Sequence, residues 1–312
     1  MSKILITGGA GFIPSSLADG LLKDPANSVI LVDNLRTGNI ANLPGKDITN
    51  CKFIKCDVNV YEDIAEVMLS QNFDYVFHYA ALVGVQRTLQ NPIDVLNDIK
   101  GFENVLRLCK NTAVKKVFFS SSSEVYGEPV EFPQNETTTP LNSRLPYAVV
   151  KNVGEAYLKS YHYTYGLEYT VFRFFNTYGI KQSNDFVISK FITAALNNAP
   201  ITIYGDGSQT RTFCYIHDNI DATLNAFNND LFTNDTVNLG NDIEISVLML
   251  AEKIIEICGS KSTIINLPPL AEGDMTRRKP DISKMKTLLN RDFTPLTTGL
   301  QKIIEHRKSL IK

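Results

Sequence analysis

The chain has 312 residues, and its 31 lysines and arginines nearly balance its 33 aspartates and glutamates, for a formal net charge of −2. This balance gives no electrostatic reason to expect a nucleic acid or an anionic membrane as the main partner, although a local basic pocket can still take a small anion. No apolar run is long enough for a membrane span, and the first residues lack the apolar stretch of a signal peptide. We therefore expect a cytoplasmic protein.

The five cysteines and four histidines are scattered along the chain. The closest pair of cysteines, Cys51 and Cys56, has four residues between its members, which matches neither a zinc pattern nor a disulfide framework. We expect small buried thiols and no metal site.

The first half of the chain alternates short β-branched or aromatic runs with longer segments of helical period. The predicted strands are 4–7, 29–33, 52–56, 75–79, 116–120 and 169–174, and the predicted helices are 12–22, 64–70, 92–110 and 146–165. Several of these strands are apolar on both faces, which favours an α/β fold with a Rossmann-like, doubly wound parallel sheet. Such sheets bind ligands at the carboxyl ends of their strands.

After about Asn176 the elements become shorter and richer in Asn, Gly and Pro. This change predicts a smaller, mixed α/β lobe. We expect a Rossmann domain over residues 1–175 and the smaller lobe over residues 176–312, with segments that can interleave.

A glycine-rich turn, TGGAGFIP at 7–14, directly follows the first predicted strand. Gly8 and Gly11 allow a tight turn and bring backbone N–H groups to a pyrophosphate at the start of the next helix. The second strand ends at Asp33, whose carboxylate can accept hydrogen bonds from an adenosine ribose, which favours NAD over NADP, although Arg36 could pair with a 2′-phosphate. Pro14 stands where a third glycine is usual, and proline is tolerated in a first helical turn.

Other cofactor contacts are expected at the ends of the neighbouring strands. Asp57 ends the third strand and could receive the adenine amino group, or it is a solvated strand end. The predicted cofactor-binding residues are Gly8, Gly11, Phe12, Ile13, Asp33, Asn34, Asp57, Val58, Ala80, Ala81, Tyr147 and Lys151.

Tyr147 and Lys151 begin a predicted helix, and a spacing of four puts the phenol and the ammonium on one face. A cation beside a phenol favours the phenolate, so Tyr147 could exchange a proton with a sugar hydroxyl. The fifth strand runs into SSSSE at 120–124, which offers hydroxyls at the carboxyl edge of the sheet.

With these motifs the chain resembles an extended short-chain dehydrogenase/reductase of the nucleotide-sugar epimerase/dehydratase family, from residue 3 to about residue 310. The segments that carry the resemblance are TGGAGF at 7–12, DNL at 33–35, AA at 80–81, SSSSEVYG at 120–127, YAVVK at 147–151, RFFNTYG at 173–179, YGDGSQTRTFCYIHD at 204–218 and RRKPDIS at 277–283. Together they are specific for the family and less specific for the reaction.

The resemblance implies a tightly held NAD⁺ that takes hydride from C4 of a sugar while Tyr147 takes the hydroxyl proton. Lys151 would hold the nicotinamide ribose and favour the phenolate. Ser122 would hydrogen-bond the same sugar oxygen.

In the smaller lobe, Asn176 and Arg211 match positions that hold the diphosphate of a nucleoside-diphosphate sugar, with a UDP-sugar favoured. A planar guanidinium suits phosphate oxygens, and Arg211 lies in an apolar, aromatic stretch where an unpaired cation would be unfavourable. Arg277 and Arg278 add positive charge.

Residues beside Ser122 select the reaction because the resemblance places them near C5 and C6 of the sugar. Ser123 and Glu124 resemble UDP-glucuronate decarboxylases and GDP-mannose 4,6-dehydratases, whereas dTDP-glucose 4,6-dehydratases have Asp-Glu. Glu124 can act as a base at C5 or assist loss of carbon dioxide, or it is a capping carboxylate. Arg144 is common to decarboxylases and some epimerases, and Arg278 could bind a uronic acid carboxylate.

The YAVVK segment and Pro146 look more like epimerases. We place decarboxylation of UDP-glucuronate narrowly ahead of 4-epimerisation, with 4,6-dehydration or release of a keto sugar as further alternatives. Asp98 replaces the usual asparagine three residues before Gly101, unless a one-residue shift presents Asn97.

A degenerate, dinucleotide-binding scaffold is the non-enzyme alternative, which an intact Tyr147 and Lys151 oppose. The predicted helices 92–110 and 146–165 are apolar enough to pack against a second copy. Because relatives commonly pair these two helices, we expect a homodimer.

Overall fold

The computed structural model describes residues 2–45, 47–269 and 277–311. The chain divides into two compact units, and each is assembled from separate stretches of sequence. Unit 1 comprises Met1–Val125, Leu141–Phe174 and Ile220–Val237, and unit 2 comprises Tyr126–Pro140, Phe175–Asn219 and Asn238–Lys312.

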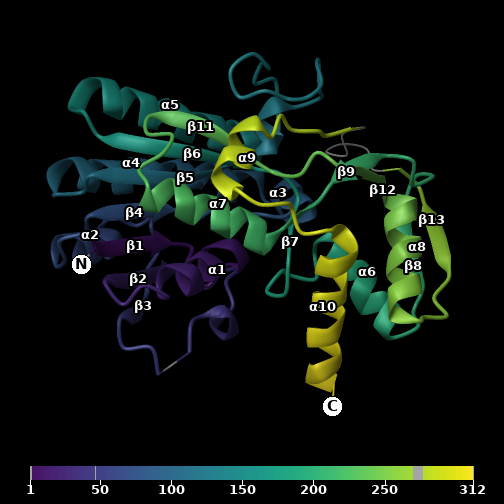
Figure 1. The fold of residues 1–312 in the computed structure, drawn as a ribbon. Coiled ribbons are helices and arrows are strands. Elements are labelled where there is room, and N and C mark those ends of the chain that lie inside the picture. The colour runs from purple at the N-terminus through teal and green to yellow at the C-terminus, as the bar shows by residue number, and fades with distance from the viewer. Residues whose placement is uncertain (1, 46, 270–276, 312) are drawn as a thin grey trace. The chain divides into compact units, whose positions relative to one another are not determined.

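A seven-stranded sheet forms the centre of unit 1 (Figure 1). In chain order its strands are β1 (Ser2–Thr7), β2 (Asn27–Asp33), β3 (Cys51–Lys55), β4 (Tyr75–His78), β5 (Lys116–Ser122), β6 (Glu168–Phe174) and β11 (Asp235–Leu239). Their order in the sheet is β11-β6-β5-β4-β1-β2-β3, and the pairs from β3 through β6 are parallel. The predicted doubly wound parallel sheet is confirmed. The strand order reverses between β1 and β4, the switch point at which such sheets bind ligands.

Helices cover both faces of this sheet. They are α1 (Phe12–Leu21), α2 (Tyr61–Leu69), α3 (Val85–Gln90), α4 (Pro92–Asn111), α5 (Pro146–Tyr165) and the part of α7 (Ile216–Asn228) from residue 220, with short 3-10 turns η1 (Ile40–Asn42) and η2 (Ser123–Tyr126). Side chains alternate along β5: Phe119 packs on Phe102 of α4, whereas Phe118 stacks on Phe77 and contacts Phe227 of α7. Each face of the sheet is therefore buried, as its apolar strands require.

The two longest helices, α4 and α5, lie side by side (Figure 1). Each begins with a proline in its first turn, Pro92 and Pro146, where no intrahelical hydrogen bond is lost. Helix α5 ends at Gly166, whose φ of 73° is the left-handed conformation typical of a helix terminus.

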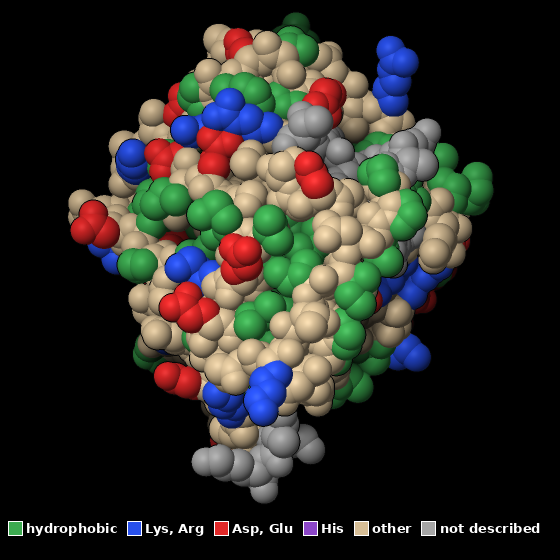
Figure 2. Space-filling view, turned by 90° about the vertical axis from the view of Figure 1, so that its right-hand side faces the viewer, with side chains coloured by type: hydrophobic (Ala, Val, Ile, Leu, Met, Phe, Trp, Pro, Cys, Tyr) green, Lys and Arg blue, Asp and Glu red, His purple; other side chains and the backbone are tan. Residues whose placement is uncertain are grey.

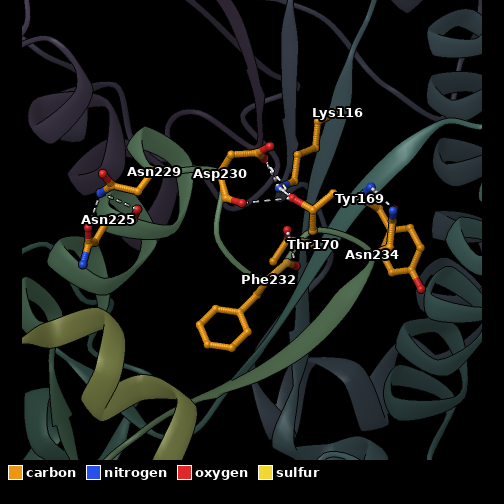
Figure 3. Close-up of polar contacts among 9 residues, drawn as sticks. Lys116, Tyr169, Thr170, Asn225, Asn229, Asp230, Phe232 and Asn234 are labelled. Atoms are coloured by element: carbon orange, nitrogen blue, oxygen red, sulfur yellow. Dashed lines mark hydrogen bonds and ion pairs between the residues drawn. The ribbon is translucent and has the colours of Figure 1, made fainter.

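At the amino end of β5, the loop between α7 and β11 is held by a polar cluster (Figure 3). The buried Lys116 donates from Nζ to Oδ1 of Asp230 at 2.9 Å. Thr170 donates to the carbonyl of Phe232, and Asn234 exchanges hydrogen bonds with the backbone of Tyr169. These contacts fix a loop with three left-handed residues and so bring β11 beside β6.

Unit 2 is mixed α/β, with short strand pairs among helices. Its elements are β7 (Thr177–Tyr178), α6 (Val187–Leu196), β8 (Ile201–Tyr204), β9 (Thr210–Thr212), β10 (Cys214–Tyr215), β12 (Glu244–Ser246), α8 (Val247–Cys258), β13 (Ile264–Leu267), α9 (Ser283–Leu289) and α10 (Leu296–Ile311). Strand β10 pairs with β7 and β13 with β8 in parallel, and β12 pairs with β9 antiparallel. On the side shown in Figure 2, hydrophobic side chains lie between scattered charged groups, and Met249 and Ile265 are among the exposed hydrophobics of this unit.

Among the described residues, no helix is both long and apolar enough to cross a membrane. Within the same residues, no three His, Cys, Asp or Glu side chains gather into a group that could hold a metal ion.

Candidate active site

The glycine-rich turn lies at the switch point between β1 and β4. Gly8 has a φ of +72°, and a Cβ at this position would lie 2.9 Å from the Cα and N atoms of Ala80. The Gly11 N–H donates to the Gly8 carbonyl at 2.8 Å, which closes the turn. Only glycine fits position 8, because both its backbone conformation and its contact with the chain after β4 exclude a side chain.

The N-terminus of α1 can offer backbone N–H groups to an anion. Gly11 is the N-cap, and no side chain caps the helix. The helical ladder begins where Ser15 N–H donates to the Gly11 carbonyl at 3.2 Å. Phe12 and Ile13 therefore present N–H groups that lack intrahelical acceptors, as a pyrophosphate requires. Pro14 removes an N–H that would have had no acceptor within the helix, so this departure leaves the helix intact.

Asp33 lies at the end of β2 and is nearly buried. Its carboxylate accepts hydrogen bonds from the N–H groups of Ala10 at 3.1 Å and Leu35 at 2.7 Å. Burial raises the pKa of Asp33, and these two bonds oppose the rise. The carboxylate thus braces the glycine-rich turn and keeps lone pairs that can accept from a ribose. The Arg36 guanidinium donates to Asp94, so it is already paired with a carboxylate.

The strand ends beside Asp33 carry the predicted adenine-side residues. Asn34 donates from Nδ2 to Oδ2 of Asp57 at 3.0 Å, and Oδ1 of Asp57 accepts from the N–H of Asn59 at 2.9 Å. The buried Val58 lies between these two residues. The ends of β2 and β3 are therefore joined by side-chain bonds, and one edge of the predicted cofactor site is fixed.

The chain after β4 is held by Thr7, the last residue of β1. Its hydroxyl accepts the N–H groups of Tyr79 at 3.0 Å and Ala80 at 3.1 Å and lies 2.9 Å from Nδ1 of His78. Burial, with the nearby Lys151 cation, lowers the pKa of His78 to about 3. His78 is thus a neutral support beneath the segment that contains Ala80 and Ala81.

Tyr147 and Lys151 lie together on α5. Lys151 is buried, its Nζ donates to the Ser120 carbonyl at 2.6 Å, and it lies 5.8 Å from the centroid of the Tyr147 ring. Burial lowers the pKa of Lys151 to about 8, against the opposing charges of Asp98 and Glu155. A buried cation beside a half-buried phenol can stabilise the phenolate.

The hydroxyl-rich segment directly follows β5. Ser122 ends the strand, and its Oγ accepts the N–H of Glu124 at 3.2 Å. Ser122 and Ser123 are buried, as is one carboxylate oxygen of Glu124. The structure thus places a hydroxyl and a carboxylate in one turn at the carboxyl edge of the sheet.

Sequence reasoning missed a buried ion pair behind the Tyr–Lys pair. Arg173 of β6 donates twice to Glu155 of α5, at 2.9 and 2.7 Å, and Ser121 donates to the same carboxylate at 2.6 Å. Glu155 lies four residues after Lys151, so it could have been assigned to the same helix face. Its partner on β6 could not have been identified from spacing.

Hydrogen bonds show which of the neighbouring residues Asn97 and Asp98 faces the loops after β3 and β4. Asp98 accepts the Leu82 N–H on Oδ2 at 2.8 Å and the Asn59 side-chain amide on Oδ1 at 3.2 Å. Asp98 is therefore the residue that turns inward.

In unit 2, two of the predicted diphosphate ligands lie close in the strand framework. Asn176 donates from Nδ2 to the Thr212 carbonyl at 3.1 Å. Arg211 lies next to Thr212 on β9, is 8% exposed, and donates to the Thr210 carbonyl. Asn176 is thus joined to the strand that carries Arg211.

Arg277 is engaged within unit 2. Its guanidinium donates twice to Glu244 at 2.6 Å and covers the Phe132 ring at 4.2 Å. Lys279 lies 3.7 Å from the same carboxylate. Arg278 is buried, with 6% of its surface exposed. The guanidinium of Arg277 is already paired with the Glu244 carboxylate, so Arg277 is less available to bind a phosphate than an unpaired arginine would be.

Comparison with known proteins adds to this geometry. The model of the NAD dependent epimerase/dehydratase family matches residues 4–240. The chain is 36% identical over 311 residues to a putative UDP-glucose 4-epimerase of Methanocaldococcus jannaschii, with 98% of each chain covered. It is 36% identical over 315 residues to UDP-glucuronic acid decarboxylase 1 of Danio rerio, covering 97% of this chain and 72% of that protein.

Among solved structures, the chain is similar to UDP-glucuronic acid 4-epimerase from Bacillus cereus in complex with UDP-glucuronic acid and NAD. The TM-score is 0.89 at 31% identity, and 99% of each chain is covered.

Proposed function

The chain belongs to the NAD-dependent epimerase/dehydratase family, and we propose that it oxidises C4 of UDP-glucuronate transiently and decarboxylates the resulting keto sugar. Members of this family are enzymes that act on nucleotide sugars. The observation that carries the choice of reaction is the turn after β5, in which Ser122 and Glu124 are joined by a hydrogen bond.

The described residues fit NAD. Gly8 lets the glycine-rich turn pack against the Ala80 backbone. The uncapped α1 presents the N–H groups of Phe12 and Ile13, and Asp33 ends β2. Bound NAD⁺ supplies the acceptor for a hydride. The pairing of Arg36 with Asp94 supports NAD over NADP, because it occupies the cation that could have met a 2′-phosphate.

Tyr147 and Lys151 carry out the proton transfer. The phenolate oxygen of Tyr147 takes the proton of the sugar 4-hydroxyl and later returns it. Lys151, fixed on the Ser120 carbonyl, stabilises that phenolate by its charge. Ser122 donates a hydrogen bond to the same sugar oxygen.

Glu124 distinguishes decarboxylation from simple epimerisation. Oxidation at C4 makes the C6 carboxylate of a uronic acid a β-keto acid, which loses carbon dioxide readily. The electron pair left at C5 then takes a proton, which Glu124 beside Ser122 can pass on after receiving it from water. Arg278, buried in unit 2, offers a cation for the carboxylate of the sugar, and Arg211 and Asn176 bind the diphosphate.

The alternative reaction is 4-epimerisation. It is supported by the similarity to a putative UDP-glucose 4-epimerase and to a UDP-glucuronic acid 4-epimerase, and by the YAVVK segment with Pro146. In that case Glu124 only caps the turn.

A panel of UDP-sugars separates these reactions. Decarboxylation of UDP-glucuronate gives a product lighter by carbon dioxide, epimerisation leaves the mass unchanged, and dehydration removes water. Glu124→Ala should abolish loss of carbon dioxide and spare 4-epimerisation. Glu128→Ala removes an exposed carboxylate four residues further on and is the matched control. Full decarboxylation by Glu124→Ala would show that the carboxylate has no part in the chemistry.

We also propose a homodimer formed through α4 and α5. Both helices expose apolar side chains, including Ile93 at 71% and Tyr163 at 91%. Analytical ultracentrifugation should show a dimer at micromolar concentration, and a monomer would refute this assembly.

A further inference from the structure

A buried ion pair joins α5 to β6, and the proposed mechanism gives it no role. Glu155 and Arg173 are 1% and 2% exposed, and the Arg173 guanidinium donates to both carboxylate oxygens of Glu155, at 2.9 and 2.7 Å. Ser121 of β5 is 3% exposed and donates a third hydrogen bond, to Oε1 of Glu155 at 2.6 Å. One carboxylate of a helix is therefore held by side chains from two strands. We call Ser121, Glu155 and Arg173 the α5 clamp.

The two strands present their donors of the α5 clamp side by side. Strands β5 and β6 are parallel neighbours, and their register sets Ser121 directly opposite Arg173. Both side chains therefore lie on the same face of the sheet, the face that α5 covers. Gly154, the residue before Glu155, allows α5 to pack closely, because a Cβ there would lie 2.8 Å from the Phe119 ring. This close packing lets the short Ser121 side chain reach the helix.

The α5 clamp lies next to the residues of the proposed proton transfer. On β5, Ser121 stands between Ser120 and Ser122. The Ser120 carbonyl accepts the Lys151 ammonium at 2.6 Å. On α5, Glu155 follows Lys151 by four residues, or about 6 Å along the helix axis. Helix and strand are thus joined at two consecutive points, one through each of these α5 side chains.

Stability alone does not account for a charged cluster at this place. A buried ion pair is often no more stabilising than apolar side chains of the same volume, because both charges must leave water. Apolar contacts are non-directional, whereas a carboxylate that accepts from a guanidinium fork and a hydroxyl is held in one orientation. The α5 clamp therefore fixes how the helix lies along β5 more sharply than an apolar contact would.

We propose that the α5 clamp positions the groups of the proton transfer. It sets the register between α5 and the end of β5, so that the Lys151 ammonium and the Ser122 hydroxyl keep the spacing that the Tyr147 phenol requires. This inference rests on the proposed roles of those three residues. Release of the clamp would leave the sugar bound and slow the chemical step, since a misplacement of about 1 Å can lower a rate by about 100-fold.

Ser121→Ala is the mildest change to the α5 clamp, because it removes one hydrogen bond and leaves the pair of Glu155 and Arg173 intact. Thr170→Val is the matched control. Thr170 lies on β6, is fully buried, and also donates one hydrogen bond, to the Phe232 carbonyl on the face of the sheet opposite α5. In urea unfolding, both variants should lose about 1 kcal/mol of stability.

We expect Ser121→Ala to lower kcat by about tenfold with whichever UDP-sugar is turned over, and to leave KM and the affinity for NAD within about twofold. Thr170→Val should keep the wild-type kcat. A clamp that only stabilised the fold would affect kcat equally in the two variants. The proposal is therefore overturned if Ser121→Ala turns over at the wild-type rate, or if Thr170→Val loses as much activity.

A measurement without sugar makes this test independent of the proposed reaction. In NAD-loaded protein labelled with ¹⁵N at lysine Nζ, the variant Lys151→Met identifies the Lys151 signal. Ser121→Ala should shift this signal, because the hydrogen bond to the Ser120 carbonyl lengthens, and Thr170→Val should leave it in place. If no UDP-sugar is turned over, the proposed function fails and this signal decides alone. An unchanged Lys151 signal in Ser121→Ala would then overturn the positioning role.

Discussion

Lys151→Met should make the folded protein more stable at neutral pH while abolishing turnover. Lys151 is 2% exposed, and burial lowers its pKa from the ordinary 10.5 to about 8. One pKa unit corresponds to about 1.4 kcal/mol, so the ionised side chain makes the folded state less stable by about 3 kcal/mol relative to the neutral one. Methionine has a similar length and no charge. It loses the hydrogen bond to the Ser120 carbonyl, so the net gain at pH 7 should be about 1–3 kcal/mol.

The sign of the pH dependence follows from linkage. Between pH 8 and 10.5 the unfolded chain still binds the Lys151 proton and the folded chain has released it, so wild-type stability rises with pH across this window. Lys151→Met lacks this rise. The stability advantage of the variant should therefore shrink by about 3 kcal/mol as the pH increases from 7 to 10.5.

Urea unfolding of both proteins at closely spaced pH values measures this difference, and the other titrating groups cancel in the comparison. A constant difference from pH 7 to 10.5 would show that Lys151 carries no desolvation penalty, and the reasoning on its poised ionisation would be refuted.

Two further variants test the framework of the site. Gly8→Ala forces a left-handed alanine and places a Cβ 2.9 Å from the Ala80 backbone. It should therefore lower the free energy of unfolding by more than about 1 kcal/mol and weaken NAD binding, as thermal melts and fluorescence titration would show. Wild-type stability and affinity would contradict this close approach. Glu155→Gln should destabilise by about 3–5 kcal/mol in urea because it strands the buried Arg173 charge, whereas Glu103→Gln on the exposed surface of α4 should change stability by less than about 1 kcal/mol. Equal effects of the two substitutions would mean that burial of the ion pair is unimportant.

Local patterns explain why much of unit 1 could be predicted from sequence. The apolar strands, the prolines at the starts of α4 and α5, and the glycine turn after β1 each depend on neighbours within a few residues. The spacing of Tyr147 and Lys151 likewise follows from helical periodicity. The predicted helix 146–165 matches α5, and helix 92–110 is one residue shorter than α4.

Long-range pairings could not be predicted. Glu155 meets Arg173 only after β6 packs on α5, and Arg277 meets Glu244 from 33 residues away. The choice of Asp98 over Asn97 depends on how α4 is rotated against the loops that carry Leu82 and Asn59. Each unit is built from three separate stretches of the chain, and this arrangement depends on long-range contacts that local sequence patterns do not reveal. The predicted boundary at residue 175 for the cofactor-binding and sugar-binding regions stays a prediction.

The central claim is that C4 of the sugar gives up its hydride to the bound cofactor during turnover. UDP-glucuronate deuterated at C4 tests this claim directly. The account predicts slower turnover than with the unlabelled sugar, deuterium in the enzyme-bound nicotinamide when the reaction is quenched, and loss of both effects in Tyr147→Phe with the cofactor retained. Product formed at the same rate from both sugars, with no deuterium ever reaching the cofactor, would contradict it.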